Sequence, residues 1–143
     1  IDTPGADLSP RAEEGALAGE IARCLVDLST LRVPSVSVLL GQGCGGGALA
    51  LLPADRVVAA EHGWLSPLPP EGASAIVHHD VGHAAEMTRR QRVGSYDLFD
   101  EGIVHVVVPE QPAAHLDPEG FARAVARTCA DQIRELLAAR VAA

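Results

Sequence analysis

The sequence has 143 residues, the size of one domain, and 48% of them are apolar, which is enough to bury a core; with only 3% aromatic residues, that core must be aliphatic. Nineteen acidic residues against eleven basic ones give a net charge of −8, which argues against a general nucleic-acid binder, because such a protein needs a basic face. No apolar run of 18 residues and no signal-peptide pattern occurs, so no membrane span and no membrane partner are predicted.

The cysteines and the first residue indicate the context of the chain. Cys24, Cys44 and Cys129 show no C-x-x-C spacing, which predicts neither a zinc knuckle nor a disulfide framework and fits a reducing, cytoplasmic compartment. The chain begins at Ile1, without Met, in a stretch typical of a strand end that enters a turn. We therefore expect residues 1–143 to form a single domain that is a fragment of a longer polypeptide.

The first predicted elements are a turn and a long helix. Asp2 and Gly5 match the D-x-x-G element of GTPases, but no G-x-x-x-x-G-K-[ST] loop is present to hold phosphates, so a GTPase is not predicted. Ser9 is a helix cap with Pro10 at the first helical position, and a helix is expected over residues 11–31. Its apolar face is formed by Leu17, Ile21, Cys24, Leu25, Leu28 and Leu31.

The rest of the chain predicts short strands and helices in alternation. Prolines and apolar runs give strands at 34–40, 55–61 and 102–108 and an extended segment at 64–68. Helices are expected at 46–52, 70–77, 81–92, 96–100 and 118–139. The last helix has one apolar face, formed by Phe121, Val125, Cys129, Ile133, Leu136 and Leu137.

The most informative stretch is GQGCGGGA at residues 41–48, which holds five of the fourteen glycines. Glycine permits a positive φ and a close approach to a ligand, and the first N–H groups of a helix have no acceptor within that helix. The stretch therefore predicts a loop followed by a helix start that binds an anion or an oxyanion through backbone amides. A second free helix N-terminus is expected at residues 70–73.

Two other interpretations of this stretch, a dinucleotide site and a nucleophilic cysteine, are weaker than the backbone anion site. Gly41-x-Gly43-x-x-Gly46 matches the dinucleotide fingerprint, with an acid at Glu61, but the following helix ends at Pro53 and is too short for a Rossmann crossover. Cys44 could be a nucleophile, yet Gln42 stands where the elbow pattern needs glycine. A small buried side chain in a tight loop is the favoured interpretation of Cys44.

Histidines and arginines in the 78–92 region give two further weak candidates. His79 and His83 have the i, i+4 spacing of zinc ligands on a helix, but Gly82 lies between them and no third ligand is indicated. Arg89, Arg90 and Arg92 could meet a ligand phosphate. We favour solvated side chains for both groups and predict no metal in this chain.

A collinear set of motifs resembles a known family. The set covers nearly the whole chain: IDTPGA at 1–6, EEG at 13–15, IAR at 21–23, VP at 33–34, the glycine stretch with ALA at 48–50, ADRV at 54–57, PEGASAI at 70–76, DL at 97–98, GIV at 102–104 and VPE at 108–110. It is similar to the carboxyltransferase α subunit of bacterial acetyl-CoA carboxylase, and most of all to the α-like half of the fused actinobacterial form.

The resemblance implies an α/β crotonase-type fold of repeated ββα units, of which this chain is the C-terminal portion. It implies a biotin-dependent acyl-CoA carboxylase activity that moves CO₂ from carboxybiotin, held on a separate carrier domain, to acetyl-CoA or a related acyl-CoA, giving malonyl-CoA-type products for fatty acid biosynthesis. The implied partners are a carboxyltransferase β-type half, the biotin carboxyl carrier protein and biotin carboxylase, in an (αβ)₂-type oligomer. No catalytic side-chain base is required, because biotin itself takes the proton.

The resemblance also implies the residues of the site. The N–H groups of Gly43 and Cys44 are expected to stabilise the biotin enolate. Cys44 departs from the family pattern, which has glycine there. The other expected contacts to biotin are Gly41, Gly45, Gly46, Gly47, Glu71, Gly72 and Ala73. Two alternatives stay open: an acyl-CoA decarboxylase or other crotonase-type enzyme, and a non-catalytic α-like domain that holds a complex together.

Overall fold

The computed structural model describes residues 1–7 and 9–142. The elements follow one another along the chain as α1 (Pro10–Glu14), α2 (Leu17–Ser29), β1 (Val36–Leu39), β2 (Gln42–Cys44), α3 (Gly45–Leu51), β3 (Arg56–Ala60), β4 (Trp64–Ser66), α4 (Pro70–His78), α5 (Ala84–Gln91), α6 (Ser95–Asp100), β5 (Val106–Val108) and α7 (Pro118–Ala142). Within the described ranges, no helix is long and apolar enough to cross a lipid bilayer.

The strands form two small parallel sheets. One sheet has the order β1-β3-β5, and the other pairs β2 with β4. Val36 lies opposite Arg56 in the first sheet, and Gln42 lies opposite Trp64 in the second. Each ββα unit therefore gives one strand to each sheet: β1, β2 and α3 form one unit, and β3, β4 and α4 form the next. This repeat agrees with the architecture expected from the resemblance.

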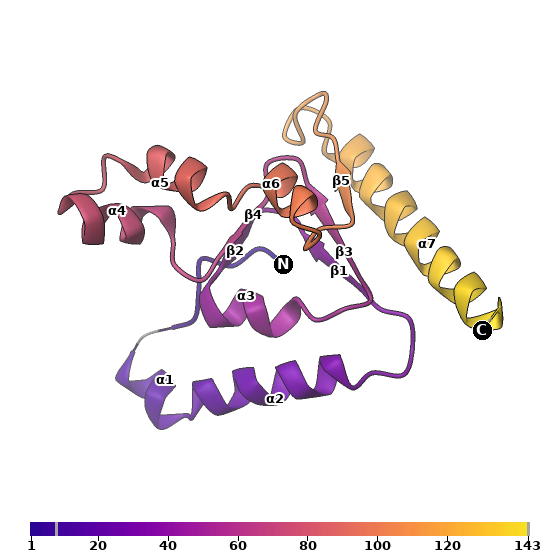
Figure 1. Cartoon of the computed structure of the whole chain (residues 1–143), viewed down its shortest axis with the longest axis horizontal. Helices are drawn as coiled ribbons and strands as arrows, with labels where there is room; N and C mark the ends of the chain where they lie inside the picture. The colour runs from indigo at the N-terminus through magenta and orange to yellow at the C-terminus, as the bar shows by residue number, and fades with distance from the viewer. Residues whose placement is uncertain (8, 143) are drawn as a thin grey trace.

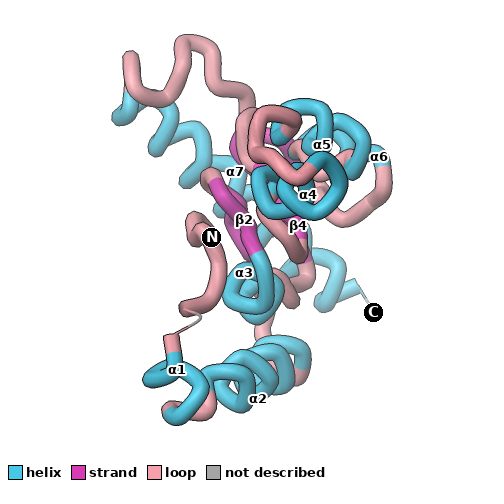
Figure 2. The backbone as a smooth tube through the Cα atoms, turned by 90° about the vertical axis from the view of Figure 1, so that its left-hand side faces the viewer, coloured by secondary structure: helices cyan, strands magenta, loops and turns pink. Residues whose placement is uncertain are grey.

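The helices surround these sheets unevenly (Figure 1). α2 packs on α3, and α3 lies between α2 and the strands, while the long α7 runs along β1, β3 and β5. α4 and α5 form a hairpin that projects at the opposite end from α7. The view along the perpendicular direction again places α1 and α2 beyond α3 and groups α4, α5 and α6 together (Figure 2).

The core is aliphatic, as the composition predicts. Its buried cluster joins both sheets, α3 and α6 and consists of Leu39, Ala48, Val57, Ala59, Leu65, Leu98 and Val104. Burying side chains of this kind contributes roughly 1.5–3 kcal/mol for each large aliphatic residue. Because the cluster includes residues next to the glycine stretch, the position of β2 and α3 is fixed by the core itself.

Three predicted elements differ from the structure. The helix expected over 11–31 is broken: α1 ends at Glu14, and Ala16 takes a left-handed backbone with φ 57° before α2 begins. α2 also ends at Ser29, so Leu31 lies beyond the helix and is 46% exposed, whereas the other members of the predicted face are half-buried. The helix expected over 81–92 begins only at Ala84, and the strand expected over 102–108 is confined to Val106–Val108.

Candidate functional site

The glycine stretch forms a short strand, which is followed directly by the start of a helix. Gln42 to Cys44 form β2, which pairs with β4 on one side and with the N-terminal segment at Thr3 on the other. The Cys44 N–H donates to the Thr3 carbonyl at 3.1 Å, and the Thr3 N–H donates to the Gln42 carbonyl at 2.7 Å. The expectation that the Cys44 amide serves as an oxyanion donor is therefore wrong for this structure, because the N-terminal segment already uses that N–H.

Gly43 lies in the middle of the same paired region. It is buried, with Thr3 beside it on one edge and Leu65 opposite it in β4. A Cβ added at Gly43 would lie 2.8 Å from both the Trp64 carbonyl oxygen and Leu39 Cδ1. Main chain occupies both sides of Gly43, so its backbone is not open to a ligand oxygen. This corrects the second predicted oxyanion donor: glycine is needed here for packing.

Gly41 has an internal carboxylate where a ligand anion was expected. A Cβ added at Gly41 would lie 2.7 Å from Asp2 Oδ1, and the same oxygen accepts the Gln42 N–H at 2.9 Å. Asp2, the first residue of the GTPase-like motif, thus caps this turn from within the chain.

The remaining glycines form the first turn of α3. Gly45 adopts φ +65°, which needs glycine, and Gly46 faces α2, because a Cβ there would lie 3.4 Å from Ile21 Cδ1. A Cβ at Gly47 would lie 3.8 Å from the nitrogen of Ala6. The N-terminal segment and α2 therefore pack against this helix start, and the glycines permit that close approach.

The start of α4 is more open and lies on a cavity of about 590 Å³. The walls come from the N-terminal segment, the starts of β2 and β4, the start of α4 and one side of α5: Pro4, Gln42, Trp64, Pro69, Pro70, Glu71, Ala84, Ala85 and Thr88. The volume lies within the range of about 300–1,000 Å³ that is typical of small-molecule sites. The structure therefore brings one part of the predicted site, Glu71, to a cavity.

The first turn of α4, which begins at this cavity, has two N–H groups without an internal acceptor among the described residues. In the part of the chain that the structure describes, the N–H groups of Glu71 and Gly72 have no acceptor, whereas the Ala73 N–H donates to the Pro69 carbonyl at 3.0 Å. Pro70 at the first helical position has no N–H to offer. Of the three residues predicted at this helix start, Glu71 and Gly72 retain free amides, and Ala73 does not.

The Cys44 thiol is buried rather than reactive. Its side chain is 3% exposed, and burial raises the pKa of the thiol, with the negative charge of Glu71 as a smaller second cause. A thiol with a raised pKa is protonated at neutral pH and is a poor nucleophile. The favoured interpretation of Cys44 as a packed side chain agrees with this environment, which also places Cys44 near Glu71.

Three of the other candidates from the sequence, Glu61, Arg90 and Arg92, have partners within the protein. Glu61, the acid of the dinucleotide-like pattern, accepts the Glu110 N–H at 2.7 Å. Arg90 pairs with Glu86 at 2.9 Å. Arg92, with φ 53°, contacts the carboxylates of Asp97, Asp100 and Glu101. These contacts support neither dinucleotide nor phosphate binding.

The predicted histidine pair is not the one that the structure forms. α4 ends at His78, and His79 takes a left-handed conformation with φ 61°, so the helical i, i+4 spacing of His79 and His83 does not exist. Instead the ring of His78 stacks on the ring of His83, with centroids 4.1 Å apart. Sequence spacing could not identify this pair, because it depends on the turn between two helices.

Gln42, Trp64 and Thr88 line the cavity but were not singled out in the sequence as candidate site residues. Trp64 is the only tryptophan, and Gln42 is the one long polar side chain in the glycine stretch. These two facts are the only features of the sequence that mark Gln42 and Trp64. Neither of them predicts that the two residues line one cavity. Thr88 reaches the cavity only because α5 folds back on α4.

Comparison with known proteins gives a consistent result. All 143 residues match the family described as acetyl co-enzyme A carboxylase carboxyltransferase-like. The chain is 56% identical over 136 residues to the probable biotin-dependent acyl-coenzyme A carboxylase beta3 subunit of Mycobacterium tuberculosis H37Rv, covering 95% of this chain and 28% of that protein. It is 40% identical over 139 residues to the acetyl-coenzyme A carboxylase carboxyl transferase subunit alpha of Deinococcus radiodurans, covering 96% of this chain and 44% of that one.

Among solved structures, transcarboxylase 12S with methylmalonyl-coenzyme A and methylmalonic acid bound superposes with a TM-score of 0.75 at 23% identity, covering 94% of this chain and 26% of that one. This likeness confirms the predicted α/β crotonase-type fold. The chain spans less than half the length of each of these relatives.

Proposed function

The chain belongs to the acetyl-CoA carboxylase carboxyltransferase-like family, and we propose that it forms the α-type half of the carboxyltransferase of a biotin-dependent acyl-CoA carboxylase. The match of the whole chain to this family carries the proposal. The reaction transfers a carboxyl group between biotin and acetyl-CoA or a related acyl-CoA. We place its product, a malonyl-CoA-type thioester, in fatty acid biosynthesis in the cytoplasm.

We propose that the site is completed by other parts of the carboxylase. This chain covers 28% of the mycobacterial relative and 44% of the Deinococcus relative. We propose a β-type carboxyltransferase half as the direct partner, in an (αβ)₂-type oligomer, with biotin carboxylase and the biotin carboxyl carrier protein as the further partners. The acyl-CoA is expected on the β-type half and biotin on this one.

The cavity at the start of α4 suits the ring of biotin. It combines a small-molecule volume with an apolar wall from Trp64 and with two free amides at a helix N-terminus. When bound there, carboxybiotin supplies the carboxyl group for the reaction. The cavity-lining residues that would hold it are Gln42, Trp64, the backbone of Glu71, and Thr88, and the free Gly72 amide follows Glu71 in the same helical turn.

In this proposal the residues bind, orient and stabilise, and no side chain acts as a general base, because biotin itself takes the proton. The amides of Glu71 and Gly72 lie at the positive end of α4, where they can donate to an oxygen that gains negative charge during transfer. Trp64 lines the cavity, and we expect its ring to keep water from one side of the bound group. The Thr88 hydroxyl already donates to the Ala84 carbonyl at 3.0 Å, which leaves its oxygen as an acceptor.

The Glu71 position allows the amide to be tested separately from the side chain. Glu71→Ala removes a charge from the cavity but keeps the N–H, whereas Glu71→Pro also removes the N–H at a helical position where proline is tolerated. We expect Glu71→Ala to retain activity and Glu71→Pro to lose about 100-fold in kcat, the usual effect of removing one oxyanion donor. The assay is malonyl-CoA-dependent carboxylation of biotin by the protein with its β-type partner.

The controls distinguish an error in the proposed biotin site from an error in the proposed function. Circular dichroism must show equal helix content for both variants. Equal activity of the two Glu71 variants would exclude the α4 amide as a donor, while leaving the carboxyltransferase assignment intact. Biotin-independent release of CO₂ from malonyl-CoA would instead support the decarboxylase alternative. Tight binding to the partner without any turnover would support a non-catalytic assembly domain.

A further inference from the structure

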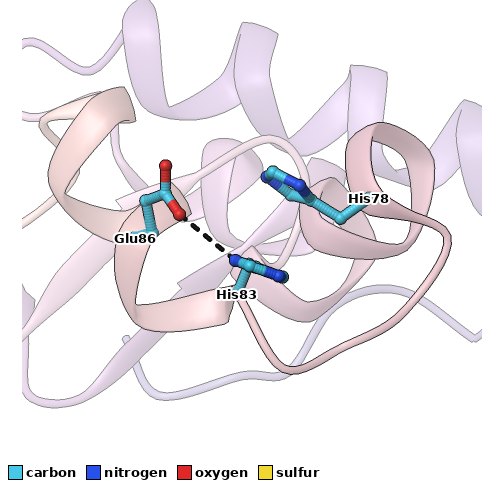
Figure 3. Close-up of side chains that lie close together, drawn as sticks. All are labelled: His78, His83 and Glu86. Carbon is cyan, nitrogen blue, oxygen red and sulfur yellow. Dashed lines mark hydrogen bonds and ion pairs between the residues drawn. The ribbon is translucent and has the colours of Figure 1, made fainter.

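Two histidines and a glutamate meet at the turn between α4 and α5 (Figure 3). His78 comes from the last turn of α4, His83 directly precedes α5, and Glu86 lies in the first turn of α5. One nitrogen of each imidazole and one carboxylate oxygen lie within 4.8 Å of one another. This cluster is not among the cavity-lining residues of the proposed biotin site.

The orientation of the side chains is already partly set. His83 Nδ1 lies 3.2 Å from Glu86 Oε2, while the other carboxylate oxygen of Glu86 contacts Arg90 at 2.9 Å. The opposite nitrogen of His83, Nε2, lies 3.9 Å from Asp80 Oδ2. Metal-bound histidines commonly have a carboxylate beside their second nitrogen, so Asp80 stands where an outer-shell partner of His83 is expected.

A buried serine holds the backbone that carries these groups. Ser74 is 0% exposed; its hydroxyl donates to the Asp80 carbonyl at 2.6 Å and accepts the His83 N–H at 3.1 Å. The Gly82 N–H donates to Asp80 Oδ1 at 2.7 Å, which closes the turn further. The backbone that carries His83 is therefore held in place by the fold.

His78 provides a second and independent observation. Its Nε2 is buried. Among the buried side-chain nitrogen and oxygen atoms of the described residues, it is the one that has no hydrogen-bond partner. A buried polar atom without a partner costs about 1–3 kcal/mol, so such atoms normally indicate a missing ligand, ion or water. The ring of His78 stacks against the ring of His83, the second histidine of the cluster, at an interplanar angle of 19°.

We propose that His78, His83 and Glu86 bind a divalent transition-metal ion, with zinc as the best match. Two imidazoles and one carboxylate with an open fourth position form a known zinc ligand set, and imidazole disfavours Mg²⁺ and Ca²⁺. Zinc–nitrogen bonds of about 2.0–2.1 Å place ligand atoms roughly 3.3 Å apart, so the three groups must close by roughly 1.5 Å at most. The His83 side chain is 46% exposed and that of Glu86 34%, which leaves both free to turn.

The charges around the cluster favour a cation. Glu86 supplies one carboxylate group to the cluster itself. Asp80 adds a second negative group at the turn. The proposed ion would hold the free end of the α4–α5 hairpin, and the proposal stands independently of the carboxyltransferase assignment.

The test is zinc titration of the metal-free protein, monitored by calorimetry and by competition with a chromophoric chelator. We expect one zinc ion per chain, with affinity reduced about 100-fold or more in His78→Ala and in Glu86→Gln, since even outer-shell partners contribute about 10–100-fold. The matched control is His79→Ala, which removes the adjacent exposed histidine outside the cluster and should leave the affinity unchanged. Cobalt substitution should give the absorption spectrum of a four-coordinate ion.

Two results would overturn the proposal. One is the absence of stoichiometric zinc binding by the unmodified protein. The other is an equal loss of affinity in His79→Ala, which would indicate adventitious binding to surface histidines. Circular dichroism of the metal-free variants separates unfolding from ligand loss, and Glu86→Gln keeps the size of the side chain, so loss of binding in that variant cannot be attributed to a packing defect.

Discussion

At the scale of single residues, the glycines from 41 to 47 serve two different purposes that the sequence does not separate. Gly43 has no room for a side chain, since an added Cβ would lie 2.8 Å from the Trp64 carbonyl and from Leu39 Cδ1. At Gly46 the nearest atom would be Ile21 Cδ1 at 3.4 Å, which is an ordinary contact. The same residue type is thus obligatory at one position and merely convenient at the other.

These two glycines give a direct comparison. Gly43→Ala should destabilise the protein strongly, by about 2–3 kcal/mol or more, because a backbone carbonyl cannot move away from the new Cβ as a side chain can. Gly46→Ala should be neutral or stabilising by up to about 1 kcal/mol, because alanine favours a helix over glycine. Urea denaturation of both variants measures the difference. Equal midpoints would contradict the packing explanation for Gly43.

At the scale of elements, the predictions succeeded where local chemistry decides the structure. Ser9 caps α1 through its side chain, and Pro69 and Pro70 begin α4 at the expected position. The apolar faces of α2 and α7 are half-buried except at Leu31 and Leu137. Local propensity could not predict β2, because a strand of three residues exists only through its pairing with Thr3 and β4, which lie far away in the sequence.

The turn between α4 and α5 shows the same limit for the candidate sites. The i, i+4 spacing of His79 and His83 suggested two ligands on one helix, but α4 ends at His78 and α5 begins only at Ala84, and the Ser74 hydroxyl organises the turn between them. Hydrophobic periodicity gives no sign of a helix hydroxyl that bonds backbone groups six and nine residues further along the chain. Both the His78–His83 pair and the cavity at Thr88 follow from this one turn.

Ser74 therefore gives the prediction for this element. Ser74→Ala removes the partner of the Asp80 carbonyl and of the His83 N–H, and each group then lacks an internal partner. We expect a loss of about 1–3 kcal/mol and faster hydrogen exchange of the amides between residues 79 and 84. Ser29→Ala is the control, because that hydroxyl is exposed and bonds only the Val26 carbonyl. Unchanged exchange in Ser74→Ala would show that the turn is held by α4–α5 packing alone.

At the scale of the molecule, segments that are distant in the sequence meet near the N-terminal ends of the strands. The N-terminal segment runs beside β2, and at the other end of the chain an Arg140 guanidinium nitrogen donates to the Arg32 carbonyl at 2.6 Å. Asp55 lies in the same region and accepts the Ser35 N–H at 2.9 Å and the Ser35 hydroxyl at 3.0 Å. These contacts join the residues before β1 and β3 to the end of α7. No sequence pattern predicts them, because they join residues 20 and 108 positions apart.

Asp55 connects this arrangement to pH. The bonds from the Ser35 amide and hydroxyl hold the pKa of Asp55 below its ordinary value, with smaller contributions from the charges of Arg140 and Arg56. A carboxyl group whose pKa is lower in the folded state stabilises the protein above the unfolded pKa, near 3.8, and that stabilisation is lost as the pH falls through the folded pKa. Asp55→Asn should therefore cost about 1 kcal/mol at pH 7, because one charge-assisted contact is replaced at an exposed site.

The difference between Asp55→Asn and the unmodified protein should shrink as the pH is lowered from 7 toward 3, since both then carry an uncharged side chain at this position. Urea midpoints across that range measure it directly. Asp100→Asn is the matched control, because the one ion pair that Asp100 makes with the described residues, to Arg92, is 3.9 Å long and exposed. If the two proteins differed in stability by the same amount at every pH, the shape of the Asp55 side chain, and not its charge, would hold together the segments before β1 and β3.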